Sequence, residues 1–273
     1  MNANETPRMP RCPICDATAQ VIGQKSLFSK ITCDVLRCDE CLHEFAILLA
    51  AVNNASRMID ALAKETYSTV DYFELDKLHQ GMNSILIDES YDPWIKARYN
   101  KLSESILSTY PSATKLRIAE VGCLEGAFVH YLQSQGHSVI GFDVNRAVVE
   151  GSRRINNINL NYLDAEFEHL PKDSYDIVLS YHTLEHVRHL DFVLENMRQS
   201  LCANGHLLIE VPSSPSEAYN PDHFHNFSEQ SLGKLVGKYF DAVTITEDSY
   251  ETITKIECRS LICVARKAGP TAP

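Results

Sequence analysis

Four cysteines near the start of the chain have the spacing of metal ligands. They form two Cys-x-x-Cys pairs, Cys12 with Cys15 and Cys38 with Cys41, joined by a segment of alternating polar and apolar residues. Two such pairs can bring four thiolates to one tetrahedral Zn²⁺, and a segment this small cannot otherwise fill a core. Four thiolates leave no open coordination position, so the predicted zinc is structural. The alternative is a set of free or redox-active thiols.

The remaining cysteines do not extend this pattern. Cys33 is predicted to be a strand residue rather than a fifth ligand, and four others stand singly in apolar surroundings. Clustered cysteines in a reducing compartment indicate a metal site rather than disulfides. The chain shows no secretory signal, and its longest apolar stretch, residues 45–52, is too short to span a bilayer. We therefore expect a cytoplasmic protein that does not cross a membrane.

A second group of residues has the spacing of a nucleotide site. A short apolar strand over residues 118–121 leads into a turn with Gly122 and Gly126, and a second strand over residues 139–142 ends at Asp143. Glycines allow backbone N–H groups to approach a ligand closely, and an acid at the end of the second strand can accept hydrogen bonds from ribose hydroxyls. This βαβ pattern predicts an adenine-nucleotide site, which is equally open to a dinucleotide dehydrogenase.

Histidines that titrate near neutrality are candidates for moving a proton. His182 follows the predicted fourth strand, and open α/β sheets bind ligands at the carboxyl ends of their strands. His186 lies one helical turn later, where it and Glu185 either contact a ligand or only orient the loop. His223 and His225 alternate along a segment that, if extended, directs both imidazoles to the same side.

We predict that His182, His223 and His225 act as general base or substrate contacts, with His225 preferred as the base. A second metal site at His223, His225 and Asp222 is the competing interpretation. It is disfavoured because the segment offers no third well-spaced ligand.

The periodicity of the chain divides it into three regions. Residues 11–50 are the predicted zinc-ribbon-like module. Residues 51–112 have helical periodicity and are predicted to form a linker or lid, with Pro93 in the first turn of its second helix. Residues 113–268 alternate strand and helix, which predicts a parallel sheet with helices on both faces. A polar segment joins the last two strands, so we expect an antiparallel hairpin at the sheet edge.

The composition fits an enzyme better than a nucleic-acid-binding protein. The 273 residues are 44% hydrophobic and 22% charged, which is ordinary for a globular enzyme, and they are enough to bury a sizeable core. The formal net charge is -11. Because a hold on phosphates needs clustered Lys and Arg, this charge argues against a broad nucleic-acid surface.

Five motifs follow one another at suitable spacing between residues 114 and 267: EVGCLEG, GFDVN, LDAEFEHLP, YDIVLSYHTLEHV and LCANGHLLIEVP. Together they resemble the class I S-adenosylmethionine-dependent methyltransferases. The resemblance implies an α/β fold with a Rossmann-like seven-stranded sheet, and S-adenosylmethionine as the methyl donor. It also implies that His182 lies near the transferred methyl group.

The resemblance assigns the cofactor contacts to the same motifs. It implies that Asp143 holds the ribose hydroxyls and that Asp164 with Ala165 meets the adenine. The methionine end of the cofactor would contact the turn residues Glu120, Gly122, Cys123 and Gly126, with Cys123 as a small filler beside the cofactor.

One position departs from the family pattern. The turn carries Leu124 where a further glycine is common. Because leucine does not easily adopt a positive φ, we expect the turn to keep ordinary dihedral angles at Leu124. Leu124 and Glu125 are accordingly weaker candidates for cofactor contacts.

The cysteine-rich head narrows the resemblance. A double Cys-x-x-Cys segment before a methyltransferase core resembles bacterial methyltransferases that act on sugars and on related glycan or natural-product precursors, with oxygen favoured as the acceptor. Ribosomal RNA guanine methyltransferases also carry a zinc head, but residues 11–50 are not notably basic. A small-molecule acceptor is therefore favoured over RNA, and a non-catalytic cofactor-binding partner protein is the third reading. The sequence does not specify an oligomeric state.

Overall fold

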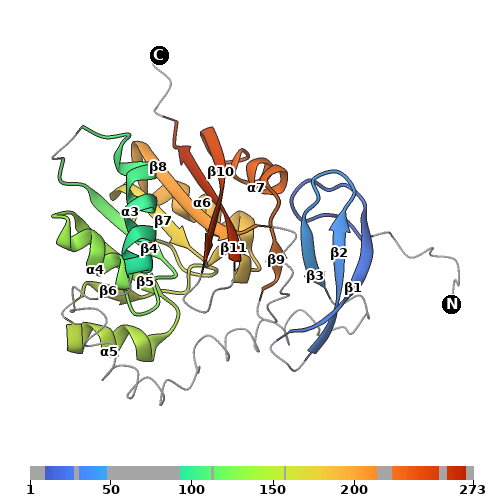
Figure 1. The fold of residues 1–273 in the computed structure, drawn as a ribbon, viewed down its shortest axis with the longest axis horizontal. Coiled ribbons are helices and arrows are strands. Elements are labelled where there is room, and N and C mark those ends of the chain that lie inside the picture. Colours follow the sequence, from blue (N-terminus) through green and yellow to red (C-terminus); the bar gives the residue numbers. More distant parts are fainter. Residues whose placement is uncertain are drawn as a thin grey trace, which may run out of the picture.

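The computed structural model describes residues 10–27, 31–47, 93–111, 114–156, 158–213, 223–251 and 257–268. Two sheets organise these residues (Figure 1): a four-stranded sheet and a seven-stranded sheet. Most of the predicted linker or lid, residues 51–92, lies outside the described residues. The predicted domain boundaries at residues 50 and 112 also fall on undescribed residues, so they stay predictions.

The seven-stranded sheet has the predicted mixed topology. Its strand order is β10-β11-β8-β7-β4-β5-β6, in which the five strands β4 to β8 run parallel and β11 and β10 form an antiparallel hairpin at one edge. The strands are β4 (Arg117–Val121), β5 (Ser138–Asp143), β6 (Leu160–Tyr162), β7 (Tyr175–Tyr181), β8 (Leu201–Pro212), β10 (Asp241–Glu251) and β11 (Glu257–Arg266). The inner strands are apolar and buried, as parallel strands covered on both faces must be.

Helices cover both faces of this sheet. Buried side chains of α3 (Pro93–Leu107), α4 (Ala127–Ser134) and α5 (Arg146–Asn156) pack in one apolar cluster, and those of α6 (Leu190–Ser200) and α7 (Glu229–Val236) pack in the other. Helix α3 begins at Pro93, as predicted, because proline fits the first turn of a helix. Among the helices of the described chain, none is long and apolar enough to cross a membrane.

The cysteine-rich module forms the smaller sheet. It contributes β1 (Ala19–Leu27), β2 (Ile31–Cys38) and β3 (Glu44–Ile47), which pair antiparallel. The fourth strand, β9 (His225–Asn226), comes from the far end of the chain and pairs with β3, so that Phe45 opposes His225. Figure 1 shows the module beside β9 and α7. The sequence did not predict this pairing, which attaches the module directly to the large domain.

Candidate functional site

Two glycines shape the turn between β4 and α4. Gly122 has φ +78°, and a Cβ there would lie 2.1 Å from Oγ1 of Thr183. Gly126 has φ +82° at the N-cap of α4, and a Cβ there would lie 2.8 Å from a methyl group of Leu160. Conformation and space therefore both require glycine at these two positions. The chain after β4 can pass close to the β7 end only because Gly122 has no side chain.

Leu124 does not keep the ordinary dihedral angles that we expected, and that prediction was wrong. Its φ is +47°, in the left-handed region. The backbone N–H of Leu124 donates a hydrogen bond to Oδ2 of Asp143 at 2.8 Å, and Leu124 is 43% exposed. This charge-assisted bond offsets the cost of a left-handed residue, which is about 1–2 kcal/mol.

Asp143 ends β5 at the carboxyl edge of the sheet. Its Oδ2 accepts from Leu124 and its Oδ1 accepts from the backbone N–H of Asn145, also at 2.8 Å. Burial raises the pKa of this carboxyl above its ordinary value, although these backbone bonds oppose the rise. Because each carboxylate oxygen has a second lone pair, Asp143 can still accept hydrogen bonds from a ligand.

Two further acids lie beside Asp143 without full hydrogen bonding. Within the described residues, Oε2 of Glu120 and Oε2 of Glu125 are buried and have no hydrogen-bond partner. Burial raises the pKa of Glu120 well above the ordinary value, and the neighbouring charges of Glu125 and Asp143 raise it further. Burial likewise raises the pKa of Glu125. Such a set of acids favours a ligand that carries positive charge.

These residues line a cavity of about 440 Å³, which is the size of a small-molecule site. The aromatic rings of Tyr99, Phe167 and Tyr181 also face it. Among the predicted cofactor contacts, those that line the cavity are Glu120, Gly122, Cys123, Asp143, Asp164 and Ala165. Gly126, the N-cap residue of α4, is absent from the lining.

Cys123 is buried in the wall of this cavity. Burial raises the pKa of its thiol well above the ordinary value, so the sulfur is uncharged at neutral pH. A Cβ at Gly141 would lie 2.5 Å from the Cys123 sulfur. The thiol therefore fills the space above β5 that Gly141 leaves open, as expected of a small apolar filler.

His182 stands at the carboxyl end of β7, lines the cavity and has φ +48°. A non-glycine residue in this region is strained, and such strain is concentrated at functional positions. Nδ1 of His182 lies 3.2 Å from Oε1 of Glu185, whose side chain is 1% exposed. Burial opposes ionisation of Glu185, but the hydrogen bond and the charge of His182 hold the pKa of Glu185 below its ordinary value.

An ion-pair network lies on the other side of His182. Nε2 of His182 is 3.4 Å from Oε1 of Glu210 and 3.5 Å from the hydroxyl of Tyr250. The guanidinium of Arg98 pairs with both Glu210 and Asp248, and its Cζ lies 4.4 Å from the centre of the Tyr250 ring. The network therefore connects α3, β8 and β10 behind His182, which lines the cavity.

The sequence did not predict this network. Glu210 did carry a signal, because it is an acid near the carboxyl end of the otherwise apolar run HLLIEVP. Arg98 and Asp248 carried none, since both stand among other charged residues. Their partnership arises only because the C-terminal hairpin returns to α3.

The other two predicted catalytic histidines lie outside the cavity lining. His225 belongs to β9, and its Nδ1 lies 3.0 Å from Nε2 of His43 in the small sheet. Burial lowers the pKa of His225 to about 3, so it is uncharged at neutral pH. The His223 ring meets the His186 ring edge-on, with centres 4.7 Å apart, and His186 lines the cavity.

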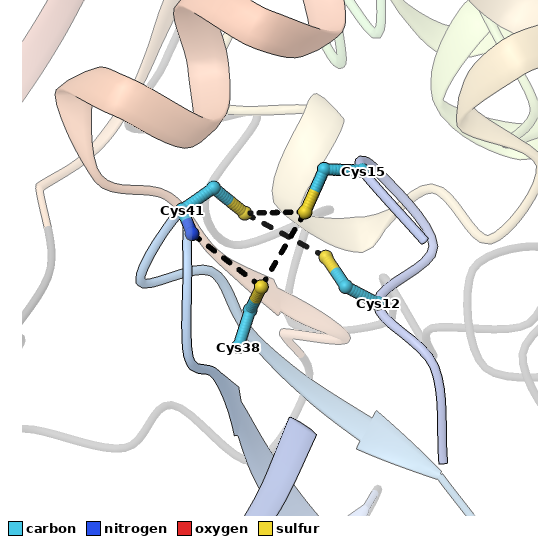
Figure 2. Close-up of side chains that lie close together, drawn as sticks. All are labelled: Cys12, Cys15, Cys38 and Cys41. Atoms are coloured by element: carbon cyan, nitrogen blue, oxygen red, sulfur yellow. Dashed lines mark hydrogen bonds between the residues drawn. The ribbon is translucent and has the colours of Figure 1, made fainter. Parts of the chain in front are cut away.

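The four cysteines of the two pairs converge as predicted (Figure 2). The sulfur atoms of Cys15 and Cys38 are 3.4 Å apart, and those of Cys12 and Cys41 are 3.6 Å apart. A tetrahedral zinc with Zn–S bonds of about 2.3 Å places its sulfurs about 3.8 Å apart. Cys33 lies in β2, outside this group, as expected. The cluster thus has the composition and nearly the dimensions of a structural zinc site.

The chain is similar in sequence to known methyltransferases. A family described as a methyltransferase domain matches residues 94–247, which is more than half of the chain. The chain is 32% identical over 126 residues to the ubiquinone biosynthesis O-methyltransferase of Rickettsia prowazekii, covering 45% of this chain and 50% of the relative. The protein of the same name from Rickettsia akari is 30% identical over 130 residues, covering 46% and 47%. The chain spans about half the length of these relatives.

Solved structures share the fold. An S-adenosylmethionine-dependent methyltransferase from Archaeoglobus fulgidus superposes with a TM-score of 0.52 at 19% identity, covering 63% of this chain and 94% of that one. Another from Methanosarcina mazei has a TM-score of 0.50 at 17% identity, covering 59% and 96%. At these identities the similarity concerns the fold alone.

Proposed function

The chain belongs to the class I S-adenosylmethionine-dependent methyltransferases, and we propose that it transfers a methyl group to an oxygen atom of a small metabolite. The observation that carries the proposal is the position of His182. This residue is held in a strained conformation beside the cavity, with Nδ1 facing the buried carboxylate of Glu185.

The cavity fits S-adenosylmethionine. Its glycine turn has no room for a Cβ at Gly122, and the buried oxygens of Glu120 and Glu125 have no hydrogen-bond partner in the described part of the chain. These acids suit the ammonium and sulfonium charges of the methionine end. Asp143 would accept hydrogen bonds from the ribose hydroxyls, and Asp164 with Ala165 would lie at the adenine.

S-adenosylmethionine supplies a methyl group bound to a positively charged sulfur. A nucleophile attacks the methyl carbon in line with the carbon–sulfur bond and displaces the sulfur. The chain must therefore align the acceptor and remove the proton of its hydroxyl. We propose that Nε2 of His182 accepts the proton of the acceptor hydroxyl. The carboxylate of Glu185 then holds the ring through Nδ1 and stabilises its positive charge. The carboxylate of Glu210 lies 3.4 Å from the same Nε2.

We propose that the acceptor is a hydroxylated small metabolite such as a sugar or a natural-product precursor. The O-methyltransferase names of the curated relatives support oxygen as the acceptor atom. The polar network of Arg98, Glu210 and Asp248 is buried behind His182 and outside the cavity lining, so it supports His182 rather than contacting the acceptor.

We further propose that Cys12, Cys15, Cys38 and Cys41 bind a structural zinc. Backbone N–H groups support two of the sulfurs, since Ile14 donates to Cys12 and Cys41 donates to Cys38, each at 3.4 Å. Such donors stabilise thiolates. All nine cysteines are free of disulfides, which supports a reducing compartment, and we propose the cytoplasm.

The test separates binding from chemistry. Calorimetry should detect binding of S-adenosylhomocysteine, and a panel of hydroxylated sugars and aromatic alcohols should be assayed for methyl transfer. His182→Gln should retain cofactor binding and lose about a hundredfold or more in turnover. The exposed His169, which packs on Phe192, provides the control variant His169→Gln.

Four outcomes would contradict parts of the proposal. Absence of cofactor binding would sink it entirely, whereas full activity of His182→Gln would remove only the assigned base. Loss of activity in His225→Gln, with intact folding and His182→Gln active, would return the role to His225. Methylation of RNA with an affinity that falls steeply with salt would favour an RNA substrate instead.

A further inference from the structure

We propose that Glu185, His186 and His223 form a second metal site, which binds a divalent first-row transition metal at the acceptor end of the cavity. One carboxylate oxygen and one imidazole nitrogen from each histidine lie within 4.8 Å of one another. This is the spacing of ligands around a single ion. None of these residues belongs to the cysteine cluster.

Two separate segments bring the three ligands together. Glu185 and His186 occupy the short 3-10 helix after β7, η1 (Leu184–His186), while His223 precedes β9. The backbone N–H of Phe224 donates to the carbonyl of Glu185 at 2.8 Å, which fixes the second segment against the first. Lys25 of the cysteine-rich module donates to the His223 carbonyl. The ligands are therefore held in place before any metal arrives.

The buried carboxylate of Glu185 provides an independent sign of a ligand. Its side chain is 1% exposed and its Oε1 faces His182, but its Oε2 has no hydrogen-bond partner among the described residues. A buried carboxylate oxygen without a partner is costly, because it has lost water and gained nothing. A metal ion bound to Oε2 would satisfy it. His182 would then support the ligand from the other oxygen, as partners of metal ligands commonly do.

The protonation states suit metal binding. Burial lowers the pKa of His223 to about 4, so its imidazole is neutral and has a free lone pair at neutral pH. One cation acts on the site: Lys25, which bonds the His223 carbonyl and whose charge acts on the His223 ring. It reduces the attraction for an ion, so the affinity depends on the three direct ligands.

The ligand set predicts which metals bind. Two imidazoles and one carboxylate suit Zn²⁺, Co²⁺, Fe²⁺ or Mn²⁺, whereas Mg²⁺ prefers oxygen ligands throughout. Three protein ligands leave at least one position open, in contrast to the four thiolates of the cysteine cluster. His186 lines the cavity, so an open position can face the acceptor.

The role of this metal rests on the proposed function. An acceptor hydroxyl bound at the open position would lose its proton more readily, because the ion stabilises the oxyanion. The proton passes to His182, the oxygen attacks the methyl carbon, and the carbon–sulfur bond breaks with its electron pair left on sulfur. The products are a methyl ether and a neutral thioether.

Cobalt provides the test in the full-length protein with its cysteine cluster already loaded with zinc. Calorimetric titration with Co²⁺ should show one more bound equivalent in the wild type than in His223→Ala, and Mg²⁺ should show none. His169→Ala, which removes an exposed histidine outside the cluster, should match the wild type. Equal cobalt binding by wild type and His223→Ala would overturn the proposal.

X-ray absorption at the cobalt edge of the wild type needs no variant and covers the case in which His223→Ala does not fold. A shell of nitrogen and oxygen scatterers with imidazole signals is expected, and a shell of sulfur alone would overturn the site. Binding of S-adenosylhomocysteine is measured on the same samples. Cobalt bound at nitrogen without cofactor binding would support the metal site and reject the proposed function. Cofactor binding without cobalt at nitrogen would support the proposed function and reject the metal site.

Discussion

Gly122 and Thr183 approach so closely that a Cβ on the glycine would lie 2.1 Å from the threonine Oγ1. The contact joins the turn after β4 to the segment after β7, and Oγ1 of Thr183 also lies 3.3 Å from the Gly122 carbonyl as a hydrogen-bond donor. The wall that would hold the methionine end of the cofactor therefore touches the segment that carries His182. A substitution at Gly122 should therefore disturb both this wall and the segment that carries His182.

Gly122→Ala should lower the affinity for S-adenosylhomocysteine at least about tenfold, because the new methyl group forces the turn away from Thr183. Gly136→Ala is the matched control. Gly136 also has a positive φ, +93°, but a Cβ there meets nothing within 4 Å. It should cost about 1 kcal/mol in the free energy of unfolding and leave cofactor affinity unchanged. Equal losses of affinity in the two variants would show that backbone strain, not the contact with Thr183, is responsible.

Cofactor affinity should depend on pH through Asp143. Burial raises the pKa of this carboxyl, and its ionised form would accept hydrogen bonds from the ribose hydroxyls more strongly than its protonated form. Affinity for S-adenosylhomocysteine should therefore be full at neutral pH and fall, by up to about tenfold per pH unit, as the pH drops through the raised pKa. The loss should begin above the ordinary aspartate value of about 3.9. Calorimetry across pH measures it.

Asp143→Asn isolates this effect from Glu120 and Glu125, whose pKa values are also raised by burial. The variant should bind about ten- to a hundredfold more weakly at neutral pH and show a flatter pH profile, since a hydrogen bond to a charged group contributes about 1.5–3 kcal/mol. Asp173→Asn, at an exposed aspartate paired with Lys267, should retain the wild-type profile. An unchanged profile in Asp143→Asn would assign the dependence to the other acids.

Loss of zinc should destabilise both the cysteine-rich module and the segment around β9. Cys38→Ser should abolish zinc binding and unfold the cysteine-rich module, because the metal would join the segment at Cys12 and Cys15 to the end of β2. The carbonyl of Cys41 accepts from Ser228 Oγ at 2.7 Å, and β3 pairs with β9. Limited proteolysis should therefore also cut near residues 223–228. Cys33→Ala, at a buried strand cysteine outside the cluster, should keep its zinc and its resistance.

The sequence predicted those parts of the site that one segment specifies. The Gly122 turn, Asp143 at the end of β5 and the two Cys-x-x-Cys pairs each depend on residues close in the chain, and the structure has them together. Leu124 was predicted wrongly, because its positive φ is stabilised by a hydrogen bond to Asp143, a residue from the next strand. Local preference alone cannot report such a partner.

Hydrophobic periodicity does not predict contacts between segments that are far apart in the chain. The pairing of β3 with β9 puts His225 opposite Phe45 in the small sheet, outside the cavity lining. For the same reason no pattern indicated that His223 would join Glu185 and His186. The segment around His223 holds no third well-spaced ligand, because its partners Glu185 and His186 follow β7.

The ion pair between Arg117 and Asp176 should stabilise the fold in a pH-dependent way. It connects β4 to β7, with 2.7 Å between Arg117 Nη2 and Asp176 Oδ1. Burial opposes ionisation, but the hydrogen bonds and the charge of Arg117 hold the pKa of Asp176 below its ordinary value. Its stabilisation is therefore present above the unfolded pKa of about 3.9 and is lost as the pH falls through the lower folded pKa.

Asp176→Asn should accordingly reduce the free energy of unfolding by about 1 kcal/mol at neutral pH, since the pair is partly exposed. The difference from the wild type should shrink below about pH 4. Urea unfolding at several pH values measures both. A difference that grew in acid would show that the interaction does not depend on the ionised carboxylate.

The buried pair of Arg98 and Glu210 should behave differently from this partly exposed one. Their side chains are 3% and 1% exposed, and removing one charge leaves the other buried with Asp248 as its remaining partner. Glu210→Gln should therefore cost about 3 kcal/mol in the free energy of unfolding, more than Asp176→Asn. Because Glu210 also lies 3.4 Å from Nε2 of His182, turnover should fall while cofactor affinity stays within about twofold of the wild type. Parallel loss of cofactor affinity would mean that the network shapes the whole cavity, and unchanged turnover would mean that it serves only to hold α3 against the sheet.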